Sequence, residues 1–178
     1  MKKILFCIAV VAVLIGAGIG IYLDVTSSEP DAVMRVIDSD KAIMTKDYSK
    51  SYAWFETDII LDSIYTCKDS AKIASIQNVF FYDDSIPCTV IMIHKENFDT
   101  VIVKNDWYLQ CVDMNKSEIK YDFTTMLKKV DKSNNIKPQT KYITLRNPLG
   151  PNPTNPYWIW GNGKLWVNAI TGKISTQE

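Results

Sequence analysis

The sequence is poor in glycine and histidine, and these shortages exclude several kinds of site. Seven of its 178 residues are glycine, and none lies between Ile21 and Leu149. A phosphate-binding loop or a dinucleotide fingerprint needs glycine where the backbone approaches the ligand, so that stretch carries neither. His94 is the only histidine, so any histidine-dependent triad or zinc site would have to use it. The 20 basic and 20 acidic side chains balance, which argues against nucleic acid as a partner.

Cysteine also lacks the spacing of a metal or redox site. Cys67, Cys88 and Cys111 follow the N-terminal segment, and no Cys-x-x-Cys pair occurs. Either one disulfide forms and one thiol is left over, or all three are buried thiols. We therefore expect no metal and no cofactor.

An apolar, uncharged run fills residues 4–23, directly after Lys2 and Lys3. Twenty residues of helix span about 30 Å, the thickness of a hydrocarbon core. We expect residues 1–25 to be an uncleaved membrane anchor, and a cleaved export signal is the alternative. Because the lysines precede the run and acidic residues follow it, residues 26–178 are predicted to lie outside the cytoplasm, membrane-anchored or, after cleavage, secreted or periplasmic. Eighteen lysines against two arginines suggest a bacterial source.

The first half of the remaining chain predicts helices and an antiparallel meander. Helical spacing favours short helices over Glu29–Asp38 and Lys68–Gln77, with an extended segment over Trp54–Tyr65 between them. Four β-branched and aromatic runs separated by polar turns then predict strands at Asn78–Tyr82, Cys88–His94, Thr100–Lys104 and Trp107–Val112.

The second half predicts one helix followed by three strands. Apolar residues at i, i+3, i+4 and i+7 favour a helix over Asp122–Val130. Strands are expected at Lys141–Arg146, Tyr157–Trp160 and Lys164–Ala169, with a proline-rich loop after the first of them. The predicted fold class is α+β: an N-terminal transmembrane helix followed by one or more antiparallel sheets with packed short helices.

His94 and the acidic pairs are the candidates for acid–base chemistry. A catalytic histidine needs a nucleophile and a carboxylate that converge on it, and no motif orders such groups here. We interpret His94 as a surface residue at a strand end. The pairs Asp38/Asp40 and Asp83/Asp84 lack the glycine and alternating oxygens of a calcium loop and are expected in turns and solvent. A small envelope hydrolase that uses His94 with nearby carboxylates is the enzymatic alternative.

Four aromatic residues near the C-terminus form the candidate binding site: Tyr157, Trp158, Trp160 and Trp166. In a strand, Trp158 and Trp160 share one face and Tyr157 shares the other with Ile159. One face should cover the helix at Asp122–Val130, while the other could present rings to a partner. The alternative is that the rest of the chain covers both faces.

The C-terminal part resembles a PepSY domain. The resemblance rests on the helix Asp122–Asp131, the strands that follow it, and the ending Val167-Asn-Ala-Ile-Thr-Gly-Lys-Ile174, which is similar to the family's V-D-A-x-T-G-x-[IVL] with asparagine in place of aspartate. It covers residues 120–178, and whether residues 26–115 are a second such unit stays open. It implies a helix packed on an antiparallel sheet in a secreted or membrane-anchored, non-catalytic module that binds or inhibits peptidases.

These observations predict a non-enzymatic protein outside the cytoplasm that binds a protein or cell-envelope partner, with membrane contact through residues 4–23. Inhibition of a peptidase is the activity that the resemblance implies. An immunity-type protein that neutralises a toxin is a further alternative.

Overall fold

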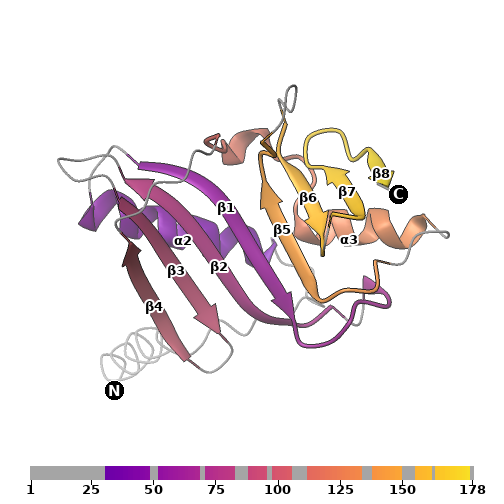
Figure 1. The fold of residues 1–178 in the computed structure, drawn as a ribbon, viewed down its shortest axis with the longest axis horizontal. Helices are drawn as coiled ribbons and strands as arrows, with labels where there is room; N and C mark the ends of the chain where they lie inside the picture. Colours follow the sequence, from indigo (N-terminus) through magenta and orange to yellow (C-terminus); the bar gives the residue numbers. More distant parts are fainter. Residues whose placement is uncertain are drawn as a thin grey trace, which may run out of the picture.

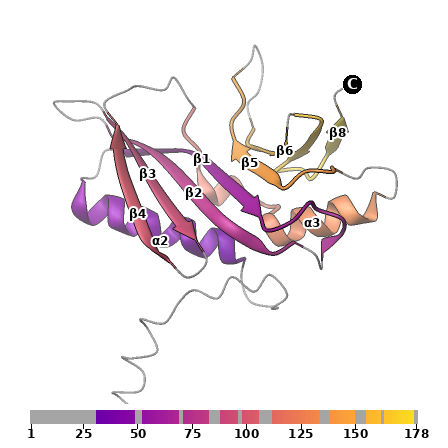
Figure 2. The same ribbon diagram turned by 60° about the horizontal axis from the view of Figure 1, so that its bottom comes forward.

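The computed structural model describes residues 31–48, 52–68, 71–82, 88–95, 98–105, 112–133, 138–149, 155–161 and 163–176. These residues form one eight-stranded antiparallel sheet with two α-helices on one side of it (Figures 1 and 2). The strand order is β4-β3-β2-β1-β5-β6-β7-β8. The elements are α2 (Ala32–Asp47), β1 (Tyr52–Leu61), β2 (Ile73–Tyr82), β3 (Cys88–Lys95), β4 (Phe98–Asn105), α3 (Phe123–Lys132), β5 (Tyr142–Arg146), β6 (Tyr157–Trp160), β7 (Leu165–Asn168) and β8 (Ile174–Thr176), with a 3₁₀ turn at Lys116–Glu118.

The chain builds the same arrangement twice. α2 is followed by the meander β1 to β4, and α3 is followed by the meander β5 to β8. The first strands of the two meanders pair antiparallel, with Asp58 opposite Thr144. The two units therefore join edge to edge and are related by an approximate twofold axis between β1 and β5 (Figure 1).

A single core lies between the helices and one face of the sheet. In α3 the buried residues are Phe123, Met126, Leu127 and Val130, the spacing that places side chains on one side of a helix. They pack with the inward residues of the strands, including Ile143, Leu145, Trp158, Trp160, Leu165 and Val167. We call this the helix face of the sheet and the opposite one the open face.

Asp31 joins the two units at their helix N-termini. Its Oδ1 accepts the backbone N–H of Val33 in α2, and its Oδ2 accepts that of Thr124 in α3, both at 2.9 Å. Such bonds stabilise a carboxylate. Burial outweighs them and, with Asp122 nearby, raises the pKa of Asp31 to about 6.

The fold class expected from the sequence is wrong. The sequence predicted a transmembrane helix followed by antiparallel sheets with short helices packed on them. The described chain is instead mostly one continuous eight-stranded sheet with two helices. None of the helices in the described ranges is long and apolar enough to cross a membrane. Residues 1–30, which include the apolar run, lie outside the described residues.

The predicted helix at Lys68–Gln77 is also wrong, because Ile73–Tyr82 forms β2 between β1 and β3. Ile76 and Phe80 point into the core while Gln77 lies half-buried on the open face. Alternation at a period of two fits that environment, and pairing on both sides overrides the local helical spacing. The first helix is longer than expected, and the predicted strand Trp107–Val112 falls almost entirely outside the described residues.

The other predicted elements are confirmed within a few residues. They are the strands at β1, β3, β4, β5, β6 and β7 and the helix α3, which begins after the N-cap Asp122. The Asp122 carboxylate accepts the N–H of Thr125 at 2.7 Å, which is the capping interaction that its place before an apolar run predicts.

Candidate functional site

The four predicted site residues divide between the two faces of the sheet. Trp158 and Trp160 are 0% and 1% exposed and lie in the core. The Trp158 indole donates to the carbonyl of Tyr121 at 2.7 Å. The rings of Trp160 and Tyr65 pack together with their centroids 4.7 Å apart. In this conformation neither tryptophan is accessible to a partner.

Tyr157 and Trp166 lie together on the open face, half-buried. Their rings meet edge to face with centroids 5.6 Å apart. The Trp166 Nε1–H donates to the carbonyl of Gly163 at 2.6 Å, so its ring is held by packing and by a hydrogen bond. This pair is the part of the predicted cluster that is partly exposed on the open face.

A polar centre lies beside the aromatic pair, across β1 and β5. Arg146 stands opposite Tyr157 in the strand pairing and forms an ion pair with Glu56 at 3.0 Å. Asp58 accepts the Thr144 hydroxyl at 2.6 Å and the Gln77 amide at 3.4 Å. These contacts tie three neighbouring strands together on the open face.

Two carboxylates, Glu56 and Asp58, and one cation, Arg146, lie in this centre. Burial and, after it, the negative charge of Asp58 raise the pKa of Glu56 to about 7 against the opposing positive charge of Arg146. Near neutral pH the centre therefore exchanges a proton at Glu56. A shallow hollow of about 230 Å³ adjoins it, lined by Asp58, Ile59, Ile60, Ser75, Gln77, Tyr142, Ile143 and Thr144.

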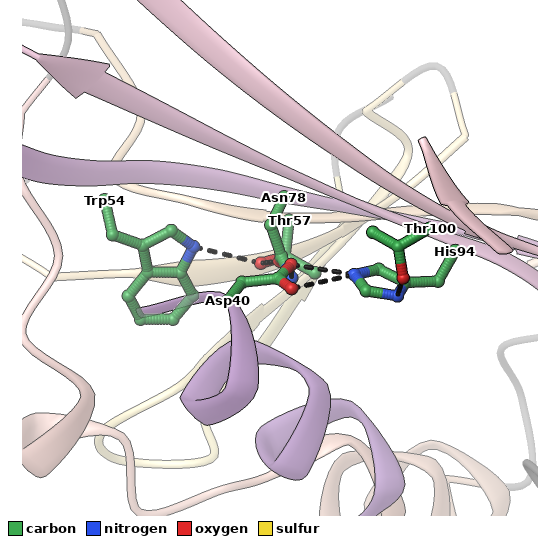
Figure 3. Close-up of polar contacts among 6 residues, drawn as sticks. All are labelled: Asp40, Trp54, Thr57, Asn78, His94 and Thr100. Atoms are coloured by element: carbon green, nitrogen blue, oxygen red, sulfur yellow. Dashed lines mark hydrogen bonds and ion pairs between the residues drawn. The ribbon is translucent and has the colours of Figure 1, made fainter. Parts of the chain in front are cut away.

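A second polar group lies on the helix face, within the first unit (Figure 3). Asp40 of α2 is fully buried, and its carboxylate accepts the Nδ2–H of Asn78 at 2.7 Å. Asn78 in turn accepts the hydroxyl of Thr57 at 2.5 Å, which accepts the Trp54 indole N–H at 3.1 Å. The buried polar atoms are thereby paired, as the cost of desolvation requires.

His94 completes this network from β3. Its Nε2 lies 2.9 Å from both oxygens of Asp40, and its Nδ1 lies 3.0 Å from the Thr100 hydroxyl on β4. Since a carboxylate only accepts, Nε2 carries the hydrogen that faces Asp40, and in the tautomer that carries only this hydrogen Nδ1 accepts from the Thr100 hydroxyl. The order is hydroxyl, imidazole, carboxylate, which is the order of groups in a hydrolytic relay.

The structure corrects the sequence interpretation of two of these residues. Asp40 is a buried helix residue and lies neither in a turn nor in solvent, and the His94 side chain is only 13% exposed. Asp38 does face solvent, where it pairs with Lys116, whereas Asp83 and Asp84 lie outside the described residues. A signal was available: Asp40 stands seven residues after Val33, on the inward stripe with Val36 and Ile37.

The two units differ at this position. The stripe Val33, Val36, Ile37, Asp40 in α2 has the spacing of Phe123, Met126, Leu127, Val130 in α3. The second unit thus has an apolar residue where the first has a buried carboxylate. The helix-and-meander arrangement as such therefore does not depend on a carboxylate at this position, although the first unit has built a buried network around Asp40.

The Thr171-Gly172 motif builds a turn. The Asn168 Oδ1 accepts the N–H groups of Ile170 and Thr171 at 2.9 and 2.8 Å. Gly172 has φ +68°, and its bare Cα lies against the Tyr121 ring. The motif therefore packs the turn after β7 against Tyr121, just before α3. Its role is structural.

Metal ligands do not gather in the described part of the chain. Nowhere in it do three or more histidine, cysteine, aspartate or glutamate side chains converge as a metal site needs. Cys67 is exposed, and the side chains of Cys88 and Cys111 lie outside the described residues.

No protein-family model, curated protein or solved structure matches this chain.

Proposed function

We propose that this is a non-enzymatic binding protein that acts outside the cytoplasm and holds a protein or cell-envelope partner on its open sheet face. Residues 4–23, apolar and preceded by lysine, would attach it to the membrane or direct its export. The open face carries the proposal, because Tyr157 and Trp166 lie there beside the polar centre. Both helices lie on the opposite side of the sheet (Figure 2).

Rigid aromatic side chains suit such a role. They offer a large contact area and lose little conformational freedom on binding. The ion pair of Glu56 with Arg146, 23% and 31% exposed, supplies polar contacts next to them. The PepSY resemblance of residues 120–178 is part of this proposal, and the helix followed by a four-stranded meander is consistent with it. A peptidase is the partner class that this resemblance favours.

Site-specific photo-crosslinking tests the binding face. A photoreactive amino acid replaces Ile159, between the two aromatic residues on the open face, in the full chain expressed in its own cell envelope. We expect a discrete crosslinked partner that is lost in the double variant Tyr157→Ala/Trp166→Ala. The matched control position is Ile64, which is 58% exposed in the loop after β1.

The proposal fails if Ile159 gives no crosslink, if Ile64 gives the same one, or if the aromatic variant leaves it unchanged. The crosslinked partner identifies the class: a peptidase fits inhibition, and a toxin fits the immunity alternative.

A hydrolase is the second candidate, and the Asp40, His94 and Thr100 contacts favour it specifically. Thr100 is exposed and would be the nucleophile, with His94 Nδ1 taking its proton. The hollow of about 230 Å³ lies on the other face of the sheet, away from this relay. Hydrolysis of activated esters by the full chain, compared with Thr100→Val and His94→Gln, decides: loss of turnover in both variants supports the hydrolase, and equal rates exclude it.

A further inference from the structure

The hollow in the open face has room for one side chain of a partner. It lies between two rows of paired residues across β2, β1 and β5, which are Gln77, Asp58, Thr144 and Ser75, Ile60, Tyr142. Its volume of about 230 Å³ is below the roughly 300–1,000 Å³ of pockets that enclose a drug-sized ligand. The hollow therefore suits a single side chain, inserted by a larger molecule that covers the face around it.

Asp58 gives this hollow its charge. It is the only charged residue among the described residues that line the hollow. Its carboxylate oxygens accept from two neutral groups, the Thr144 hydroxyl at 2.6 Å and the Gln77 amide at 3.4 Å. Arg146 forms its ion pair with Glu56, and neither of these two residues lines the hollow. A cation that enters the hollow would therefore give Asp58 an ion pair that the described residues do not supply.

The walls of the hollow suit an ammonium group on an aliphatic stem. The hydroxyl oxygen of Ser75 can accept from an ammonium, and Ile60 offers an aliphatic surface to the stem. The Tyr142 ring is 52% exposed and lies 5.4 Å from the Nζ of Lys141, a cation–π contact of the kind that an inserted ammonium would make. Because neutral donors already take both oxygens of Asp58, a point charge fits it better than the two-pronged guanidinium of arginine.

We propose that the hollow receives the side chain of a lysine on a protein partner, with its ammonium on Asp58 and its stem between Ile60 and Tyr142. This inference rests on the proposed function, because it specifies what a partner on the open face presents. Asp58, Ile159 and Trp166 stand in one row of the sheet across β1, β5, β6 and β7. At about 4.8 Å from strand to strand, Asp58 and Trp166 are roughly 14 Å apart, so one protein partner covers both.

A small lysine probe tests the hollow before any partner is known. The full chain in mild detergent, labelled at its isoleucine methyl groups, is titrated with Nα-acetyl-lysine methylamide and followed by NMR. We expect the Ile60 signal to shift in a saturable way while that of Ile64, in the loop after β1, stays unchanged. The norleucine analogue, which has the same stem without the charge, should bind at least about tenfold more weakly.

Variants of two aspartates assign the binding to Asp58. Asp58→Asn should weaken binding of the lysine probe at least about tenfold, whereas Asp38→Asn is the matched control and should leave it unchanged. Three results would each overturn the inference: no saturable shift of Ile60, equal binding of the lysine and norleucine probes, or binding only after Lys141→Met. The last result would show that the chain's own ammonium fills the hollow.

The photo-crosslinking assay separates this inference from the proposed function. With the photoreactive amino acid at Ile159, Asp58→Asn should reduce the crosslinked partner at least about tenfold, and Asp38→Asn should leave it unchanged. A crosslink that Asp58→Asn does not weaken overturns this inference while the proposed function stands. If Ile159 gives no crosslink even with Asp58 intact, the proposed function and this inference fail together.

Discussion

The buried carboxylate of Asp40 and the imidazole of His94 meet at 2.9 Å, although 54 positions separate them in the chain. The contact joins α2 to β3 and lies at the centre of the network that also holds Asn78, Thr57 and Thr100 (Figure 3). Because Asp40 is fully buried, its carboxylate oxygens need these hydrogen-bond partners in place of water.

Removing that carboxylate should therefore be costly. We expect Asp40→Ala to lower the free energy of unfolding by about 3–5 kcal/mol, since His94 and Asn78 would lose their buried acceptor. Urea denaturation measures the change. The control is Asp38→Ala, whose side chain is 58% exposed in its ion pair with Lys116 and should cost no more than about 1 kcal/mol. Equal effects of the two substitutions would contradict the role of the network.

Asp31 should make stability depend on pH. Its folded pKa of about 6 lies above the ordinary value of 3.8, so the folded chain binds this proton more tightly than the unfolded chain. The contribution is complete below about pH 4 and is lost as the pH rises through about 6, a change of up to about 3 kcal/mol. Urea denaturation of wild type and Asp31→Asn at pH 4, 5, 6 and 7 measures this change. The free energy of unfolding of the wild type should fall by this amount relative to that of Asp31→Asn, and a difference that stays constant with pH would refute the pKa of Asp31.

Glu56 should act in the same direction in a slightly higher window. Its pKa is raised from 4.5 to about 7, so the stability that it contributes below about pH 4.5 is lost as the pH rises through about 7. The free energy of unfolding of wild type minus that of Glu56→Gln should therefore fall across that range. Glu118→Gln, at an exposed residue, is the control for the loss of a carboxylate away from this centre. A rise with pH at Glu56 would show that Arg146, and not burial, dominates.

Gly172 should tolerate no side chain. A Cβ there would overlap the Tyr121 ring, and the residue has φ +68°. We expect Gly172→Ala to destabilise by at least about 2 kcal/mol, because the steric overlap adds to the backbone strain. Gly163→Ala is the matched control: φ is +85° and the nearest atom would be 3.6 Å away, so only the strain remains. Thermal unfolding that ranks Gly163→Ala as the worse variant would contradict this account.

Asn168 should be replaceable by aspartate but not by alanine. Its Oδ1 accepts two backbone N–H groups, and a carboxylate oxygen can accept both. Asn168→Ala leaves them without this acceptor and should cost about 1–2 kcal/mol, whereas Asn168→Asp should change stability little at neutral pH. Chemical denaturation compares the two. An equal loss in both variants would show that the side-chain oxygen is not what matters.

The spacing of apolar residues correctly predicted the helices and strands that bury a single face. The spacing of Phe123, Met126, Leu127 and Val130 located α3 because one face of that helix meets one apolar layer. The alternation of Tyr157 to Trp160 likewise separated the two tryptophans in the core from Tyr157 on the open face. Ile73 and Ile76 misled the same reasoning, because their i, i+3 spacing is that of a helix. Both are buried in β2 because the pairing with β1 shifts register between Ile60 and Leu61, which leaves an extra residue between them.

By itself, the sequence determined the shortage of glycine that excludes nucleotide loops, the apolar run at residues 4–23, and the aromatic strand at 157–160. Only the tertiary structure decided that β1 and β5 join two meanders into one sheet, that Asp40 meets His94, and that the two tryptophans of β6 lie in the core. The reason is physical. Composition and periodicity describe which side of an element is apolar, whereas pairing between distant strands depends on packing across the whole chain.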